Sequence, residues 1–114
     1  MPIPVLKSLS SIQLDSDALP PDPSDCVVTI DAEIGFGDLP GADRFSFDVV
    51  TPSALARDDL PRWGRGYLLV PEFSWDAVRR AVVKLLLHAD RATWPEAASE
   101  LGKEMRWEFE HYAP

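Results

Sequence analysis

Acidic and aromatic residues alternate near the end of the chain, and the acidic ones are the best candidates for chemistry. The stretch reads Trp107, Glu108, Phe109, Glu110, His111, Tyr112. On a strand, Glu108 and Glu110 would lie about 6–7 Å apart at the backbone, a spacing that paired glycosidase carboxylates can have. Such a pair needs a concave sugar site, and no other pattern in the sequence indicates one. These two glutamates and His111 would not all point to one face, so they offer few metal ligands.

The rest of the sequence contains no familiar catalytic or cofactor motif. It has no glycine-rich phosphate loop, no paired-cysteine metal spacing and no His-Glu-x-x-His, and His88 suits the end of a helix. The single cysteine, Cys26, cannot form an internal disulfide, which favours a reducing compartment and a small apolar role on a strand. We therefore predict no catalytic residues, no cofactor and no metal site. A small hydrolase that uses Glu108 and Glu110 is the enzymatic alternative.

A closing strand explains the same residues without catalysis. Because side chains alternate along a strand, Trp107 and Phe109 would share one face with Met105. Arg106, Glu108 and Glu110 would share the other face. The sequence thus predicts that the aromatic residues belong to the core and that the glutamates face solvent.

Alternating apolar residues predict the other strands. The clearest is residues 26–36, where every second side chain from Cys26 to Phe36 is apolar. Residues 44–50 repeat the pattern, and the two segments read as an antiparallel pair. Residues 3–13 could form an opening edge strand. Residues 64–72 are apolar on both faces at their centre, which predicts a central strand covered on both sides.

Three segments carry helix signals. Thr51 and Pro52 suit the start of a short helix over residues 51–60. Residues 74–90 form the strongest helix, with Ser74 as its cap and an apolar stripe at helical spacing. Thr93 and Glu96 have the spacing of a capping box for a helix over residues 93–104, which Gly102 can end.

These elements predict an α+β protein of one domain, residues 1–114. The sheet is expected to be mainly antiparallel, with two main helices packed on one face. A chain of 114 residues, 46% of them hydrophobic, can bury one core without disulfides. Its start lacks the features of a signal peptide and its apolar runs are too short to span a bilayer, so we expect a cytoplasmic protein without a membrane partner.

The net charge of −8 is concentrated in one segment. Ser8–Asp43 contains eight acids and no Lys, Arg or His, whereas the remaining residues balance 11 acids with 11 bases. An acidic surface repels phosphates, so direct binding to nucleic acid is not expected. It would attract a basic partner.

The predicted strands turn several acids outward. Asp31 and Glu33 lie on one strand, Asp48 on the next, and Glu108 and Glu110 on the last. If the helices cover only one face of the sheet, these carboxylates share the other. Like charges packed together cost stability, which a partner or the nearby Arg44, Arg65 or Arg106 could offset.

The order of motifs resembles the immunity protein 8 family of bacterial polymorphic toxin systems. The segments on which the resemblance rests are FSFDVVTPSAL, GRGYLLVPEFSWDAV and TWPEAASELGKEMRWEFEHY. The resemblance spans residues 44–112 and is loose over residues 1–43. Trp107-Glu108-Phe109 with Tyr112 is its most specific part. The chain departs from the pattern at His111, where an acid is expected, and in the Ser-Ala-Leu that follows Thr-Pro.

The resemblance implies a non-enzymatic antidote that binds and blocks a cognate toxin domain. It brings no catalytic residues and leaves the toxin's chemistry open, although the acidic charge suits a basic toxin such as a nuclease. We expect the partner to contact Asp31, Glu33, Asp48, Glu108 and Glu110, with Trp63 as an exposed aromatic anchor. A third interpretation is an assembly subunit held by its apolar strands. The sequence leaves the oligomeric state open.

Overall fold

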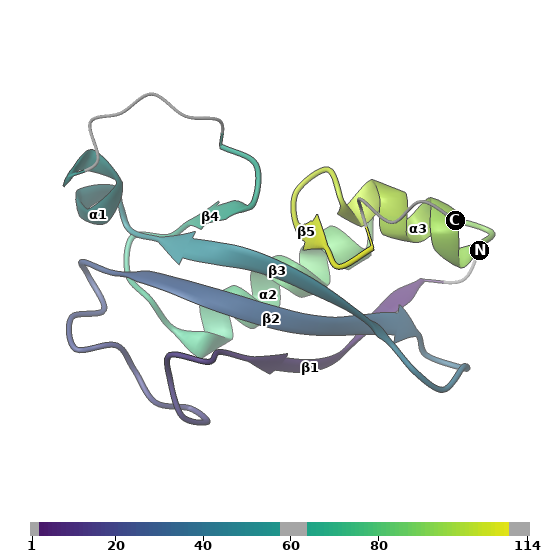
Figure 1. The fold of residues 1–114 in the computed structure, drawn as a ribbon, viewed down its shortest axis with the longest axis horizontal. Coiled ribbons are helices and arrows are strands. Elements are labelled where there is room, and N and C mark those ends of the chain that lie inside the picture. The colour runs from purple at the N-terminus through teal and green to yellow at the C-terminus, as the bar shows by residue number, and fades with distance from the viewer. Residues whose placement is uncertain (1–2, 58–63, 110–114) are drawn as a thin grey trace.

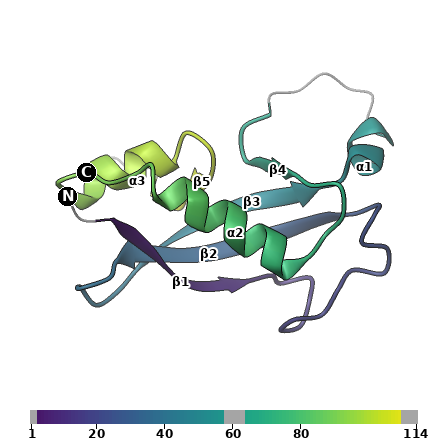
Figure 2. The same cartoon turned by 180° about the vertical axis from the view of Figure 1, so that it is seen from behind.

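The protein is described by a computed structural model that covers residues 3–57 and 64–109. A five-stranded sheet has the order β1-β2-β3-β4, and β5 also pairs with β3 (Figure 1). Helix α2 lies across one face of the sheet (Figure 2). The predicted α+β class, with a mostly antiparallel sheet and two main helices, is confirmed. The elements are β1 Pro4–Ser10, β2 Val27–Phe36, β3 Asp43–Val50, α1 Pro52–Arg57, β4 Tyr67–Leu69, α2 Trp75–Leu86, α3 Trp94–Leu101 and β5 Arg106–Trp107.

The antiparallel pair of β2 and β3 forms the centre of the sheet, as the alternation predicts. Its register runs from Val27 opposite Val50 to Ile34 opposite Asp43. The inward-facing side chains are all buried and meet the helices: Val28, Ile30, Ala32, Ile34, Phe45, Phe47 and Val49. Strand β1 adds the antiparallel edge, with a bulge between Leu6 and Ser8.

The two long helices begin where the sequence predicts. The Ser74 hydroxyl accepts the N–H of Ala77 at 3.0 Å at the start of α2. The Thr93 hydroxyl accepts the N–H of Glu96 and donates to its carboxylate at 2.7 Å. Thr51, by contrast, is buried, and its hydroxyl accepts the N–H of Cys26 at 3.0 Å. Helix α1 begins at Pro52, as predicted, and the Thr51 carbonyl accepts the N–H of Leu55 at 3.0 Å, while the Thr51 hydroxyl links the end of β3 to the residue before β2.

Strand β4 differs from the prediction of a central, doubly covered strand. It has three residues and pairs in parallel with β3, placing Tyr67 beside Asp48 and Leu69 beside Val50. Leu69 is 58% exposed. The apolar run predicts burial on both faces, but helices cover only one face and β4 lies at the sheet edge.

Strand β5 is shorter than the predicted closing strand. It contains Arg106 and Trp107, after which the chain turns at Glu108 and Phe109. The Trp107 indole packs against the core and stacks on Phe45 at 6.4 Å between ring centroids. Phe109 is 42% exposed, so its predicted place in the core is wrong. The alternation of a strand ends where the chain turns, and Phe109 instead contacts Trp107 edge to face.

One carboxylate joins the last elements to the centre of the sheet. The Oδ2 atom of Asp43 accepts the indole N–H of Trp94 at 2.7 Å and that of Trp107 at 3.0 Å. Because these tryptophans belong to α3 and β5, Asp43 ties both elements to the start of β3. The Asp43 carboxylate therefore has a structural role as a hydrogen-bond acceptor, which the charge pattern does not reveal.

Candidate partner-binding surface

The face of the sheet opposite α2 is formed by the outward side chains of β1, β2, β3 and β5, and we call it the open face. In Figure 1 the strands lie in front of α2, so this view looks onto the open face. Its cross-strand neighbours follow from the registers. The residues are Ser8, Ser10, Thr29, Asp31, Glu33, Arg44, Ser46, Asp48 and Arg106.

Asp31 supplies the uncompensated charge of the open face. It lies between Ser10 of β1 and Ser46 of β3, two neutral side chains. Among the described residues it forms no ion pair, and its side chain is partly exposed. The outward phase predicted for Asp31 is confirmed, and no cation of the described part of the chain pairs with its carboxylate.

Glu33 also lies on the open face, but an arginine accompanies it. Arg44, its cross-strand partner, places Nε 3.5 Å from a Glu33 carboxylate oxygen. The Arg44 side chain is 57% exposed and that of Glu33 is 35% exposed. Such a pair is worth about 0–1 kcal/mol, so a partner can compete for either charge at low cost.

Asp48 is the most ordered acid of the three. Its carboxylate accepts the Thr29 hydroxyl at 2.7 Å and lies 3.4 Å from Nη2 of Arg106. The side chain is 20% exposed. Arg65, which the sequence also offers as a nearby cation, donates to the carbonyl oxygens of Gly102 and Met105. Thus Asp48 is held by Thr29 and Arg106.

The remaining predicted partner residues have different positions. Glu108 is exposed, and its carboxylate accepts the main-chain N–H of Arg44 at 2.8 Å. It therefore extends the edge contact between β3 and β5. Glu110 and Trp63 lie outside the described residues.

Within the acidic segment, Asp25 also has a structural partner. It accepts hydrogen bonds from Arg57 and from the Ser53 hydroxyl, which join the loop before β2 to α1. The hydrogen bond from Arg57 is the main reason that the pKa of Asp25 lies below its usual value. Together with Asp43, this shows that part of the acidic segment stabilises the fold.

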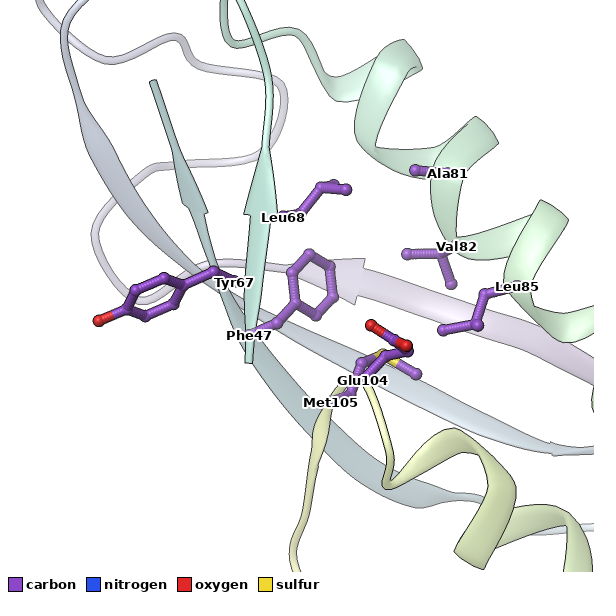
Figure 3. A pocket seen from close by; sticks show the side chains of 8 residues that line it. All are labelled: Phe47, Tyr67, Leu68, Ala81, Val82, Leu85, Glu104 and Met105. Carbon is purple, nitrogen blue, oxygen red and sulfur yellow. The ribbon is translucent and has the colours of Figure 1, made fainter. Parts of the chain in front are cut away.

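The structure contains an apolar cleft that the sequence analysis missed. It lies between β4 and α2, has a volume of about 190 Å³, and is shown in Figure 3. Its lining residues are Phe47, Tyr67, Leu68, Ala81, Val82, Leu85, Glu104 and Met105. The sequence signal for it is the apolar stripe of α2, part of which lines the cleft. The short β4 leaves Ala81 and Leu85 of α2 only partly covered.

Cys26 lies just before β2 and is partly buried. Burial raises the pKa of its thiol, and the negative charges of Asp22 and Asp25 raise it further. A raised pKa lowers the thiolate fraction at neutral pH, and the thiolate is the reactive form. This environment fits the predicted role of a small structural residue.

Cys26 is therefore expected to react slowly with a disulfide reagent at pH 7. The native protein should react several times more slowly than the same protein in concentrated urea, where the thiol regains its ordinary pKa and full exposure. The measurement is the release of the coloured thiol from Ellman's reagent under both conditions. Equal rates would show that the fold does not protect Cys26.

The described residues form neither a metal site nor a membrane-spanning helix. Across residues 3–57 and 64–109, no three His, Cys, Asp or Glu side chains are grouped so that they could hold a metal ion. Within the same ranges, every helix is too short or too polar to cross a membrane.

The chain was compared with protein families, curated proteins and solved structures. A family model described as Immunity protein 8 matches residues 5–112. Searches of curated proteins and of solved structures returned no significant match. The match includes the first strands, where the resemblance read from the sequence motifs is loose.

Proposed function

The chain belongs to the immunity protein 8 family, and we propose that it neutralises a cognate bacterial toxin domain by binding it in the cytoplasm, without catalysis. The family match over residues 5–112 is the observation that carries this proposal. It supports a role in a toxin system for the whole described sheet and both long helices. The toxin domain would be delivered by contact or secretion from a neighbouring cell.

The open face is the proposed docking surface. Among the described residues, Asp31 offers a carboxylate without an ion pair, and Glu33 offers one paired with the exposed Arg44. Asp48 is fixed by Thr29 and Arg106, so it can accept a cation without first losing much side-chain freedom. These negative charges would attract a basic surface on the toxin, such as the substrate-binding face of a nuclease. Covering that face would block the toxin.

The test uses the cognate toxin domain, which the proposed function expects a neighbouring gene to encode. Co-expression of this chain is expected to restore growth to cells that produce the toxin domain. The purified proteins should elute together from a sizing column as a stable complex. A toxin domain from an unrelated locus is the control and should neither bind nor be neutralised. Growth arrest despite equal expression of both proteins, with no complex in the column, would refute the proposed function.

A further inference from the structure

We propose that the cleft between β4 and α2 is a second docking site, which receives an apolar side chain of the toxin that lies next to a lysine or arginine. This inference rests on the proposed function and adds a site on the helix-covered side of the sheet. The residues that line the cleft indicate which kind of side chain it would bind.

The floor and walls of the cleft are apolar. Phe47, Val82 and Met105 are buried and form its inner part, whereas Leu68 and Leu85 are partly exposed at its sides. Figure 3 shows the Phe47 ring and Leu68 facing α2 across the opening, while the Tyr67 ring points away. A volume of about 190 Å³ exceeds the roughly 150 Å³ of a protein cavity that holds benzene. A phenylalanine or leucine side chain therefore fits.

A single carboxylate gives the cleft its charge preference. Glu104 is the one charged residue in its lining and is exposed. In Figure 3 its carboxylate lies between the Phe47 ring and Leu85. Among the described residues Glu104 forms no ion pair, whereas nearby Glu100 is paired with Lys103 at 2.9 Å and Arg91 at 3.3 Å. The cation that Glu104 lacks would come from the partner.

A smaller hollow continues the cleft beyond Glu104. It has a volume of about 70 Å³, shares Leu85 and Glu104 with the larger one, and is also lined by Lys103 and Glu100, which form an ion pair with each other at 2.9 Å. Glu104 thus lies between two concave surfaces and is accessible from both. A cation that follows an apolar side chain along an extended segment can reach Glu104 from this direction. An anion beside Glu104 would meet a carboxylate that has no ion pair among the described residues, and it should bind more weakly than a cation, because Lys103 is already paired with Glu100.

The cleft and the open face meet at one edge of the sheet. Leu68 lines the cleft, and its neighbour Tyr67 pairs with Asp48 of the open face. A toxin segment that passes around β4 could therefore occupy both sites at once. This continuity favours the same partner for both surfaces.

The chemistry of the cleft can be measured on the isolated protein. The probe is 3-phenylpropylamine, with 3-phenylpropionate as its anionic counterpart and propylamine as the control without a ring. We expect the phenyl amine to shift the amide NMR signals of Leu68, Ala81 and Leu85, with an affinity in the millimolar range. The anion should bind several times more weakly, and Glu104→Gln should remove most of that difference. Shifts elsewhere only, or equal binding of amine and anion, would overturn the proposal.

The second arm uses the toxin domain itself. Ala81→Phe fills the cleft from α2, and Glu104→Lys reverses its charge. Each is expected to weaken the complex about tenfold or more, mainly through faster dissociation. The controls are Val83→Phe, at a 43% exposed position of α2 outside the cleft, and Glu72→Lys, an equal charge change at an exposed loop. Both controls should bind like the parent. Thermal melting shows which variants remain folded, and Glu104→Lys keeps the test valid if Ala81→Phe does not.

The two proposals fail in different ways. If the parent binds the toxin domain and both folded cleft variants bind it equally well, the cleft is not a docking site and the proposed function stands. If the parent does not bind the toxin domain at all, both proposals are refuted, whatever the phenyl amine does.

Discussion

Replacing Trp107 with alanine is expected to lower the free energy of unfolding by about 3 kcal/mol. The indole packs against the core, stacks on Phe45 and donates its N–H to Asp43 at 3.0 Å. Its removal leaves a void beside Phe45 and takes away one of the two bonds by which Asp43 holds the last elements. The measurement is urea unfolding followed by far-ultraviolet circular dichroism, which does not depend on tryptophan fluorescence.

Two variants separate the causes of this loss. Trp107→Phe keeps one aromatic ring beside Phe45 but removes the N–H and the second ring of the indole, so it should cost less than Trp107→Ala, about 1–2 kcal/mol. Glu108→Gln is the control next to it in the chain, because a glutamine oxygen can still accept the N–H of Arg44. Its effect should stay below about 0.5 kcal/mol. If Trp107→Ala unfolded at the same urea concentration as the parent, the place of β5 in the sheet would be wrong.

The centre of the fold could be predicted because its signals are local. Alternation from Val28 to Ile34 sets the inward face of β2 without knowledge of any other strand. The caps formed by Ser74 and Thr93 depend on residues three positions away. All the residues that produce such a signal lie close together in the sequence, and the structure confirms these predictions.

The edges of the fold could not be predicted in the same way. The apolar run around Leu68 predicts a central strand, because it does not reveal how many strands flank it. Phe109 continues the alternation of β5 in sequence, but pairing with β3 ends before it. The hydroxyl of Thr51, the residue before α1, accepts a hydrogen bond from the N–H of Cys26, a residue 25 positions away. In each case a contact between distant segments decides the outcome.

The candidate surface shows the same division. The period of two places Asp31, Glu33 and Asp48 on one face, as the structure finds. It does not give the register that sets Glu33 opposite Arg44, or the β5 pairing that brings Arg106 to Asp48. The cleft was missed because it depends on how much of α2 the short β4 leaves uncovered. The sequence therefore predicts that the open face carries acids, but it does not predict which of these acids are paired with arginines.

Asp31→Lys is expected to slow association with the toxin domain about tenfold at low salt. Asp31 is the open-face acid without an ion pair among the described residues, so its reversal disturbs no internal partner. Glu33→Lys and Asp48→Lys are less suitable, because each would leave an arginine beside a new cation. Steering by exposed charges acts mainly on the association rate, so dissociation should change less.

The salt dependence and a matched control decide whether the effect is local. Rates are measured by stopped flow for the parent, Asp31→Lys and Glu72→Lys, at low ionic strength and at about 0.15 M, where the screening length is about 8 Å. Because Glu72→Lys changes the net charge equally at an exposed loop, it reports the general effect of charge. Asp31→Lys should associate more slowly than this control and show the flatter salt dependence, while protecting cells less well. If both variants associated equally fast at low salt, the toxin would not dock on the open face. The acids of β2 would then serve solubility, and recognition would have to lie on another surface of the chain.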